Sequence, residues 1–338
     1  MKPPEMNHPT DLRGMAASVA ARVETSMRSD LDAALAGSDP LLVAVLHYAL
    51  FNGGKRIRPL LTVLCSRCCG RDDESLYLLA AAFEYLHVAT LVHDDVIDRA
   101  EQRRGKDTVA ARYGLSAAIL AGDWLHARSM HLIGRLAGAD GLEIFCQATA
   151  SMVNGEFEQL RYVGDIATKE QQYFDVIRQK TGNLIASTCA IGALFAGADE
   201  TRQKALAAYG DHIGAAFQVV DDLLDFLGNT DSTGKKTGND FIEGKITLPL
   251  LNALNRATDQ ERQAVQALME GDRTQPEAYR QLYALIEHHG GFHSAALTAR
   301  QLVEAALASL APFSASSPEE ENIALLKELA EYILARKK

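Results

Sequence analysis

Long apolar runs are missing from this chain. No stretch approaches 18 uninterrupted apolar residues, so a membrane span is not expected. The N-terminal stretch Met1–Thr10 is polar and proline-rich, and it lacks the apolar core of a signal peptide. These two absences lead us to expect a cytoplasmic protein without stable membrane insertion.

An excess of basic residues is also missing. The net charge is −10 over 338 residues, which argues against a nucleic acid as the main partner. It does not exclude small anionic ligands, because local basic clusters and metal ions decide whether those bind. Hydrophobic residues make up 47% of the chain, so a large folded core is expected.

Cysteine is scarce, with five residues, which is an odd number. Cys65-x-x-Cys68-Cys69 could indicate a metal or redox pair, but the chain has no second pair of this kind. Buried free thiols in a reducing compartment are the favoured interpretation. A serine or cysteine nucleophile with triad partners is not evident either.

Strand-like alternation is nearly absent, and the apolar periodicity is helical almost throughout. We therefore predict an all-α fold, a large antiparallel helical bundle. Because no low-complexity linker divides the sequence, residues 1–338 are expected to form one domain, with residues 1–12 as a flexible tail. A loop is expected at Arg99–Asp107. The predicted helices are Leu41–Phe51, Pro59–Cys69, Asp73–Asp98, Leu115–Leu136, Leu142–Leu160, Lys169–Phe195, Thr201–Leu227, Ile246–Leu268, Pro276–His288, Gly291–Leu310 and Pro318–Lys338.

What the chain does contain is one acidic pattern twice, inside apolar helical stretches. The two clusters are Asp94, Asp95 and Asp98, and Asp221, Asp222 and Asp225. Residues i and i+4 share a helix face, so each cluster presents two carboxylates in one direction. Burying such charges costs several kcal/mol unless cations compensate them, and Mg²⁺ shared with substrate phosphates fits best. A single cluster would more often be a solvated helix face, but the apolar surroundings of both favour metal binding.

Five basic sites are interleaved with these clusters. They are Lys55-Arg56-Ile57-Arg58 after Gly53-Gly54, Arg103-Arg104, Lys180-Thr181, Lys235-Lys236, and Lys245. Each alone is a common solvated feature. Together they could hold two diphosphates, because arginine offers a bidentate fork and lysine a point charge.

Two histidines lie near the first cluster. His87 precedes Asp94 by seven residues, two helical turns on the same face, which makes contact with a ligand as plausible as a packing role. His93 points about 100° away from that face and is interpreted as structural.

These residues resemble the trans-type polyprenyl diphosphate synthases over roughly residues 42–338. The motifs that carry the resemblance, in order, are Gly53–Pro59, Asp94–Asp98 with Arg103-Arg104-Gly105, Gly155-Glu156 with Gln159-Leu160, Lys180-Thr181-Gly182, Phe217-Gln218 with Asp221–Asp225, and Gly244-Lys245 with Thr247-Leu248-Pro249. The resemblance implies the isoprenoid synthase fold with a central active-site cavity, and a homodimer. It also implies condensation of an allylic diphosphate with isopentenyl diphosphate.

The resemblance also assigns roles to residues. Asp94 and Asp98, supported by Asp95, would hold two Mg²⁺ ions, and Asp221, with Asp222 and Asp225, a third. The isopentenyl diphosphate site would consist of Lys55, Arg58, His87 and Arg104. The allylic diphosphate would be bound by Arg103, Lys180, Lys235 and Lys245, with Thr181 and Gln218 at the reacting end. Catalysis would rest on the aspartates together with Arg103, Lys180 and Lys235.

Product length should depend on the helix before the first cluster. Ala89 and Thr90 lie five and four residues before Asp94, and both are small where short-chain relatives place an aromatic floor. Tyr85 is either a deeper wall or a residue that faces a neighbouring helix, and Met152 is a candidate for a lower floor. The expected product is C30–C50, with octaprenyl as the central value, for quinone side chains. A farnesyl or geranylgeranyl product is the alternative.

Other functions are less consistent with the sequence. A class I terpene cyclase would not need the basic site at Lys55, Arg58 and His87. A metal phosphohydrolase would need more histidine ligands near His93-Asp94. A non-catalytic subunit of a heterodimeric synthase would be expected to lose carboxylates or basic sites, and here both clusters are complete.

Overall fold

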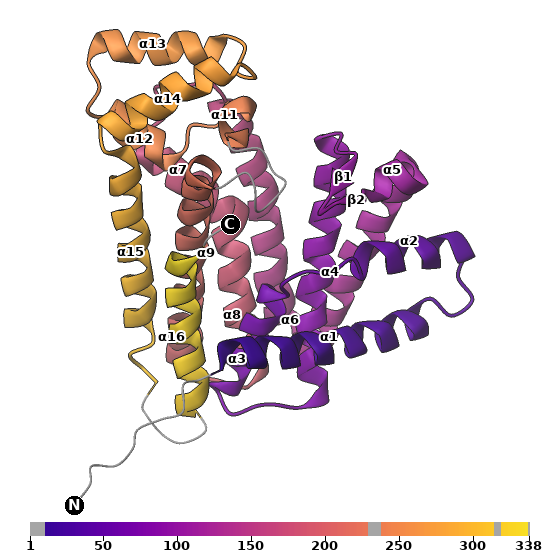
Figure 1. The fold of residues 1–338 in the computed structure, drawn as a ribbon. Coiled ribbons are helices and arrows are strands. Elements are labelled where there is room, and N and C mark those ends of the chain that lie inside the picture. Colours follow the sequence, from indigo (N-terminus) through magenta and orange to yellow (C-terminus); the bar gives the residue numbers. More distant parts are fainter. Residues whose placement is uncertain (1–10, 229–237, 314–318, 337–338) are drawn as a thin grey trace, which may run out of the picture. The chain divides into compact units, whose positions relative to one another are not determined.

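The computed structural model describes residues 11–228, 238–313 and 319–336, and helices form nearly all of this part of the chain (Figure 1). The helices are α1 Leu12–Ala34, α2 Pro40–Leu50, α3 Ile57–Arg67, α4 Glu74–Ile97, α5 Val109–Tyr113, α6 Leu115–Tyr162, α7 Glu170–Ile177, α8 Asn183–Phe195, α9 Glu200–Leu227, α11 Asn239–Glu243, α12 Leu248–Leu254, α13 Asp259–Glu270, α14 Pro276–His288, α15 Gly291–Ser309 and α16 Glu319–Ala335. A π-helical turn, η1 Arg178–Gly182, joins α7 to α8. The all-α prediction is confirmed.

The chain divides into two compact units, each assembled from separate segments. The first comprises Met1–Cys146, Thr188–Gln203 and Phe313–Leu326, and the second comprises Gln147–Ser187, Lys204–Pro312 and Lys327–Lys338. The expectation of one domain over residues 1–338 stays a prediction. Asp11 caps α1 by accepting a hydrogen bond from the Gly14 N–H at 2.9 Å, and Leu12 is buried, so these two residues do not belong to the expected tail.

Helix α4 forms the centre of the first unit, where it packs against α1 and α3. It is long and apolar enough to cross a membrane by length and composition alone, but most of its apolar part is buried within the protein. Small residues Ala80, Ala81 and Ala82 lie in this buried part and let neighbouring helices approach closely. The length and burial of α4 are those of a core helix.

The structure differs from several of the predicted elements, and α1 was not among the predicted helices. The expected helix Ile246–Leu268 is two helices, because Thr258 and Glu261 form a capping box that starts α13. The expected loop Arg99–Asp107 contains a small antiparallel hairpin, β1 Gln102–Arg103 and β2 Lys106–Asp107. Arg104 and Gly105 have φ values of 54° and 74°, which suits the tight turn of such a hairpin.

The five cysteines are free, as predicted. Cys65, Cys68 and Cys189 are buried, and burial raises the pKa of the Cys69 thiol to about 11. None of these thiols has the electropositive, exposed setting of a reactive cysteine.

Candidate active site

The first aspartate cluster lies in the last turns of α4. Asp95 is buried, and its Oδ1 accepts a hydrogen bond from Arg103 Nε at 2.7 Å. Burial raises the pKa of the Asp95 carboxyl, although Arg103 acts against this shift. Asp94 is half-buried and Asp98 is exposed at the end of the helix. The cluster therefore combines one carboxylate fixed by the protein with two nearer the surface.

A cavity of about 570 Å³, open to solvent, lies beside this cluster. We call it the arginine cavity. His87, Asp95, Arg103 and Arg104 all line it, so the structure brings together four of the predicted site residues. The hairpin β1–β2 carries both arginines, and Arg104 Nη1 donates to the Gly53 carbonyl at 2.8 Å. Gly54, with φ of 152°, lies against the same guanidinium.

Acidic and basic side chains both line the arginine cavity, and four arginine charges act on His87. Burial, and after it the charges of Arg58, Arg104, Arg56 and Arg103 in that order, together lower the pKa of His87 to about 2. A neutral imidazole surrounded by guanidinium groups is a setting that favours an anionic ligand over another cation.

The basic segment before α3 is less uniform than its sequence indicates. Arg56 is buried, has φ of 49°, pairs with Glu84 and donates to the Leu50 carbonyl, so it supports the structure. Arg58 is half-buried, and its Nε is buried without a hydrogen-bond partner. Burial lowers the pKa of Arg58, although Glu84 opposes the shift. Lys55 is exposed and is not among the residues that line the arginine cavity.

The second aspartate cluster lies at the end of α9, and two of its carboxylates are buried. Asp222 accepts hydrogen bonds from the Tyr173 hydroxyl at 2.6 Å and from Gln218 Nε2 at 2.9 Å. Burial raises the pKa of Asp222 to about 8, and the nearby charge of Asp240 adds to the effect. Buried, uncompensated negative charge of this kind is what a bound cation relieves.

The other two aspartates of this cluster have different partners. Asp225 accepts hydrogen bonds from the backbone N–H groups of Asn239 and Asp240, at 3.3 and 3.1 Å, and so holds the start of α11. Asp221 is half-buried and lies 3.4 Å from Arg336 Nη2. The Arg336 guanidinium also stacks 4.2 Å from the centre of the Phe217 ring.

A second cavity, of about 640 Å³, lies beside these residues, and we call it the lysine cavity. Lys180, Gln218, Asp222 and Lys245 line it. Lys180 Nζ lies 2.8 Å from the Glu156 carboxylate and 3.4 Å from Gln159 Oε1. Thr181 Oγ1 donates to Gln218 Oε1 at 3.4 Å.

Local backbone structure positions Lys180. It lies in the π-helical turn η1, a feature that often marks a functional site. A Cβ atom at Gly155 would lie 2.8 Å from the Lys180 backbone nitrogen, so glycine is needed where α6 passes this turn.

Lys245 is held by acidic partners. Its Nζ lies 3.2 Å from Asp240 Oδ1 and 2.5 Å from Glu243 Oε2. Burial acts to lower the pKa of Lys245, but the charges of Asp240 and Glu243 raise it overall. Lys235, also expected at this site, lies outside the described residues.

The predicted product-length residues are placed as follows. Ala89 is buried, and the Thr90 hydroxyl donates to the His87 carbonyl at 2.8 Å; neither residue lines the arginine cavity. The Tyr85 hydroxyl lies 3.1 Å from both Met27 O and Asp30 Oδ2, so Tyr85 faces the neighbouring helix α1 rather than a cavity. Met152 is half-buried on α6 in the second unit.

The sequence interpretation missed three residues of the lysine cavity. Tyr173 lies seven residues before Lys180, and this spacing is the one that singled out His87 before Asp94. Asp240 pairs with Lys245 five residues later. Thr247 caps α12, and its buried Oγ1 has no hydrogen-bond partner although it lines the cavity. For Thr247 the only sequence signal was its place in Lys245-Ile246-Thr247-Leu248-Pro249.

Comparisons with known proteins identify the family of the chain and its structural relatives. Residues 39–286 match the family described as polyprenyl synthetase. The octaprenyl diphosphate synthase of Haemophilus influenzae is 38% identical over 74% of this chain and 76% of its own length. Heptaprenyl diphosphate synthase component 2 of Geobacillus stearothermophilus is 40% identical over 64% of this chain and 67% of its own. The crystal structure of a polyprenyl synthase from Caulobacter crescentus CB15, complexed with calcium and isoprenyl diphosphate, is 33% identical and superimposes with a TM-score of 0.86, covering 98% of this chain and 100% of that one.

Proposed function

The chain belongs to the polyprenyl synthetase family and is a prenyltransferase, and we propose that it makes a long-chain all-trans polyprenyl diphosphate. It would elongate an allylic diphosphate by successive condensations with isopentenyl diphosphate to a C30–C50 product, with octaprenyl as the central value. The arrangement that carries the proposal is the arginine cavity, where His87, Arg103 and Arg104 lie beside Asp95 of the first aspartate cluster.

We assign the arginine cavity to isopentenyl diphosphate. The unpartnered Arg58 Nε and the guanidinium groups around neutral His87 supply donors and positive charge for a diphosphate. Lys55, which is exposed, would reach the same anion from the solvent side. We assign the lysine cavity to the allylic diphosphate, with Lys180 and Lys245 binding its oxygens.

The residues present fit Mg²⁺. All six aspartates offer hard oxygen ligands, and a bound cation would favour the ionised form of Asp222, whose pKa burial raises. Asp94, Asp98, Asp221, Asp222 and Asp225 would hold the ions, three in all, with Asp95 supporting. Bound Mg²⁺ supplies neutralisation of the diphosphate charge that develops as the carbon–oxygen bond breaks.

Side chains of the protein supply the other contributions to the reaction. Lys180 and Lys245 stabilise the departing diphosphate. Thr181 and Gln218, already hydrogen-bonded to each other, orient the reacting end of the substrate. Apolar side chains such as Val176 and Ile177 in the lysine cavity keep water away from the allylic cation.

Product length is assigned to the α4 face that carries Ala89 and Thr90. The test uses purified protein with farnesyl diphosphate and radiolabelled isopentenyl diphosphate, followed by chain-length analysis of the products. Wild type is expected to give C30–C50 products and Ala89→Phe shorter ones, while Ala89→Ser, which stays small, keeps the wild-type length. Products that stop at C15 or C20 in wild type would overturn the long-chain proposal. Unchanged length in Ala89→Phe would show that another helix face lines the growing chain.

A homodimer acting in the cytoplasm is part of the proposal. On α6, Leu115, Ile119 and Leu120 are 58, 40 and 63% exposed, an apolar face that suits a protein partner. The name of the heptaprenyl relative, a "component 2", raises the second possibility of a different partner chain. The molar mass from light scattering of the isolated wild-type chain and of Leu120→Lys distinguishes a homodimer from a chain that needs a different partner. A wild-type dimer that the substitution dissociates supports self-association, and an inactive monomeric wild type indicates a missing partner.

A further inference from the structure

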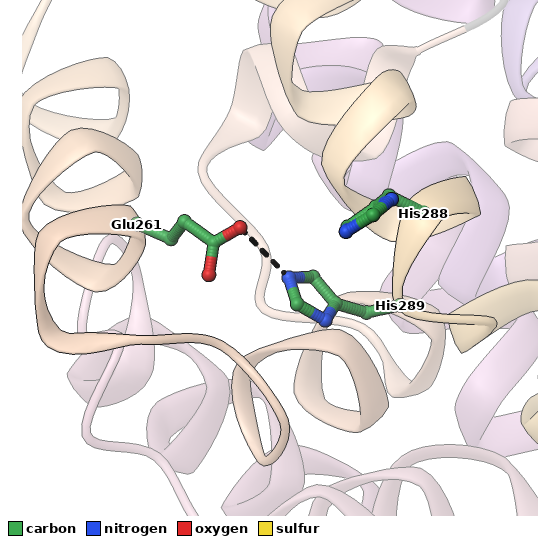
Figure 2. Close-up of side chains that lie close together, drawn as sticks. All are labelled: Glu261, His288 and His289. Carbon is green, nitrogen blue, oxygen red and sulfur yellow. Dashed lines mark hydrogen bonds and ion pairs between the residues drawn. The ribbon is translucent and has the colours of Figure 1, made fainter.

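Glu261, His288 and His289 lie close together where α13 begins and α14 ends (Figure 2). One possible ligand atom of each lies within 4.8 Å of the others. His289 Nε2 is 3.0 Å from Glu261 Oε1, and the two histidine rings have centroids 4.9 Å apart. None of these residues lines the arginine or the lysine cavity.

The spacing suits a metal ion. Donors bound at about 2.0–2.2 Å to one ion are themselves roughly 3–3.5 Å apart. The separation of His289 Nε2 and Glu261 Oε1 already has this value, so an ion can replace the proton they share. One His288 ring nitrogen lies within 4.8 Å of both atoms, close enough for His288 to be the third donor, and its exposure leaves an entry path for the ion.

The carboxylate is held in place for this role. Glu261 Oε2 accepts hydrogen bonds from the Thr258 N–H and hydroxyl at 2.8 Å each, while Oε1 points to His289. The bonds from Thr258, and then from His289, lower the pKa of Glu261 to about 2. Arg256 donates to the His289 carbonyl and to Ser294 Oγ, at 2.8 and 2.9 Å, which fixes the backbone of His289.

We propose that Glu261, His288 and His289 form a binding site for a first-row transition-metal dication such as Zn²⁺. Two imidazoles and one carboxylate suit such ions, whereas Mg²⁺ prefers a shell of oxygen ligands. The site is therefore chemically distinct from both aspartate clusters. A bound ion would link the first turn of α13 to the last turn of α14.

The test uses tag-free full-length protein in saturating Mg²⁺, which occupies the aspartate clusters. Zn²⁺ binding is measured by competition with a chromophoric chelator, and Co²⁺ binding by its visible absorption. Wild type should bind one more Zn²⁺ ion than His288→Ala/His289→Ala. Thermal unfolding of wild type, and not of the variant, should shift upward by roughly 3–6 °C at saturating Zn²⁺. His293→Ala, which removes an exposed histidine of α15, should bind Zn²⁺ like wild type.

Equal stoichiometry and affinity in wild type and the double variant would overturn the proposal and leave an ordinary histidine–carboxylate hydrogen bond. If the double variant does not fold, the Zn²⁺ affinity of Glu261→Gln tests the proposal instead. The amide keeps the capping geometry but ligates poorly, so Zn²⁺ affinity should fall at least tenfold. Unchanged Zn²⁺ affinity in Glu261→Gln would equally refute the site.

Discussion

The two aspartate clusters share one spacing but differ in what surrounds them. On α4, Asp95 is buried and bonded to Arg103, while Asp94 is half-buried and Asp98 is exposed. On α9, Asp222 and Asp225 are buried and bonded to a tyrosine, a glutamine and backbone N–H groups. Spacing on a helix decides which carboxylates share a face, and tertiary partners decide which of them also support the fold.

The largest expected effect follows from removing the first carboxylate of each cluster. Asp94→Ala and Asp221→Ala should each lower turnover by roughly 10³-fold or more, because the charge of the departing diphosphate would lose metal stabilisation. Turnover is measured with labelled isopentenyl diphosphate at saturating Mg²⁺, and circular dichroism checks that the helical fold persists. Near-normal turnover in either variant would contradict metal binding by that cluster.

A second prediction compares how much one aspartate of each cluster contributes to the free energy of unfolding. Asp225→Ala should lower the free energy of unfolding by about 1–3 kcal/mol, because the N–H groups of Asn239 and Asp240 lose their acceptor. Asp98→Ala, at an exposed position, should change it by no more than about 0.5 kcal/mol. Urea denaturation measures both. Equal losses of unfolding free energy in the two variants would mean that the two clusters support the fold equally.

The contrast between the two clusters shows which features of the site the sequence could predict. Helix class, both clusters and the gathering of His87, Arg103 and Arg104 followed from periodicity, spacing and motif order, which are local signals. The roles of Arg56 and Tyr173 depend on partners distant in sequence, Glu84 and Asp222, and a single sequence carries no signal for such pairs. The start of α13 was a local signal that was missed, since Thr258-x-x-Glu261 is readable as a capping box.

The positive surroundings of the first cluster lead to a pH prediction. The folded-state pKa of His87 is about 2, below the unfolded value of 6.5, so only the unfolded chain takes up this proton as pH falls below 6.5. His87 therefore contributes stability that is present above pH 6.5 and is lost at lower pH, by up to about 1.4 kcal/mol per pH unit.

The measurement compares wild type with His87→Gln, which has no titrating group at this position. Urea denaturation between about pH 5 and 7 should show the steeper acid loss only in wild type. The His87 ring signal in a proton NMR titration of the substrate-free protein should not shift over this range. A titration midpoint near the ordinary histidine value would show that the arginines do not crowd His87 as described.

The smallest expected effect concerns Arg336, which lies beside the second cluster. Its guanidinium lies 3.4 Å from Asp221 and rests on the Phe217 ring, so it competes with a cation for that carboxylate. Because such a partly exposed pair is worth about 0–1 kcal/mol, Arg336→Ala should lower the half-saturating Mg²⁺ concentration roughly two- to fivefold. Arg336→Lys, which keeps the charge, should change it less. A higher Mg²⁺ requirement in Arg336→Ala would instead mean that Arg336 helps to hold Asp221 in its metal-binding position. Each cluster would then contain an aspartate positioned by an arginine, since Arg103 is bonded to Asp95 in the first.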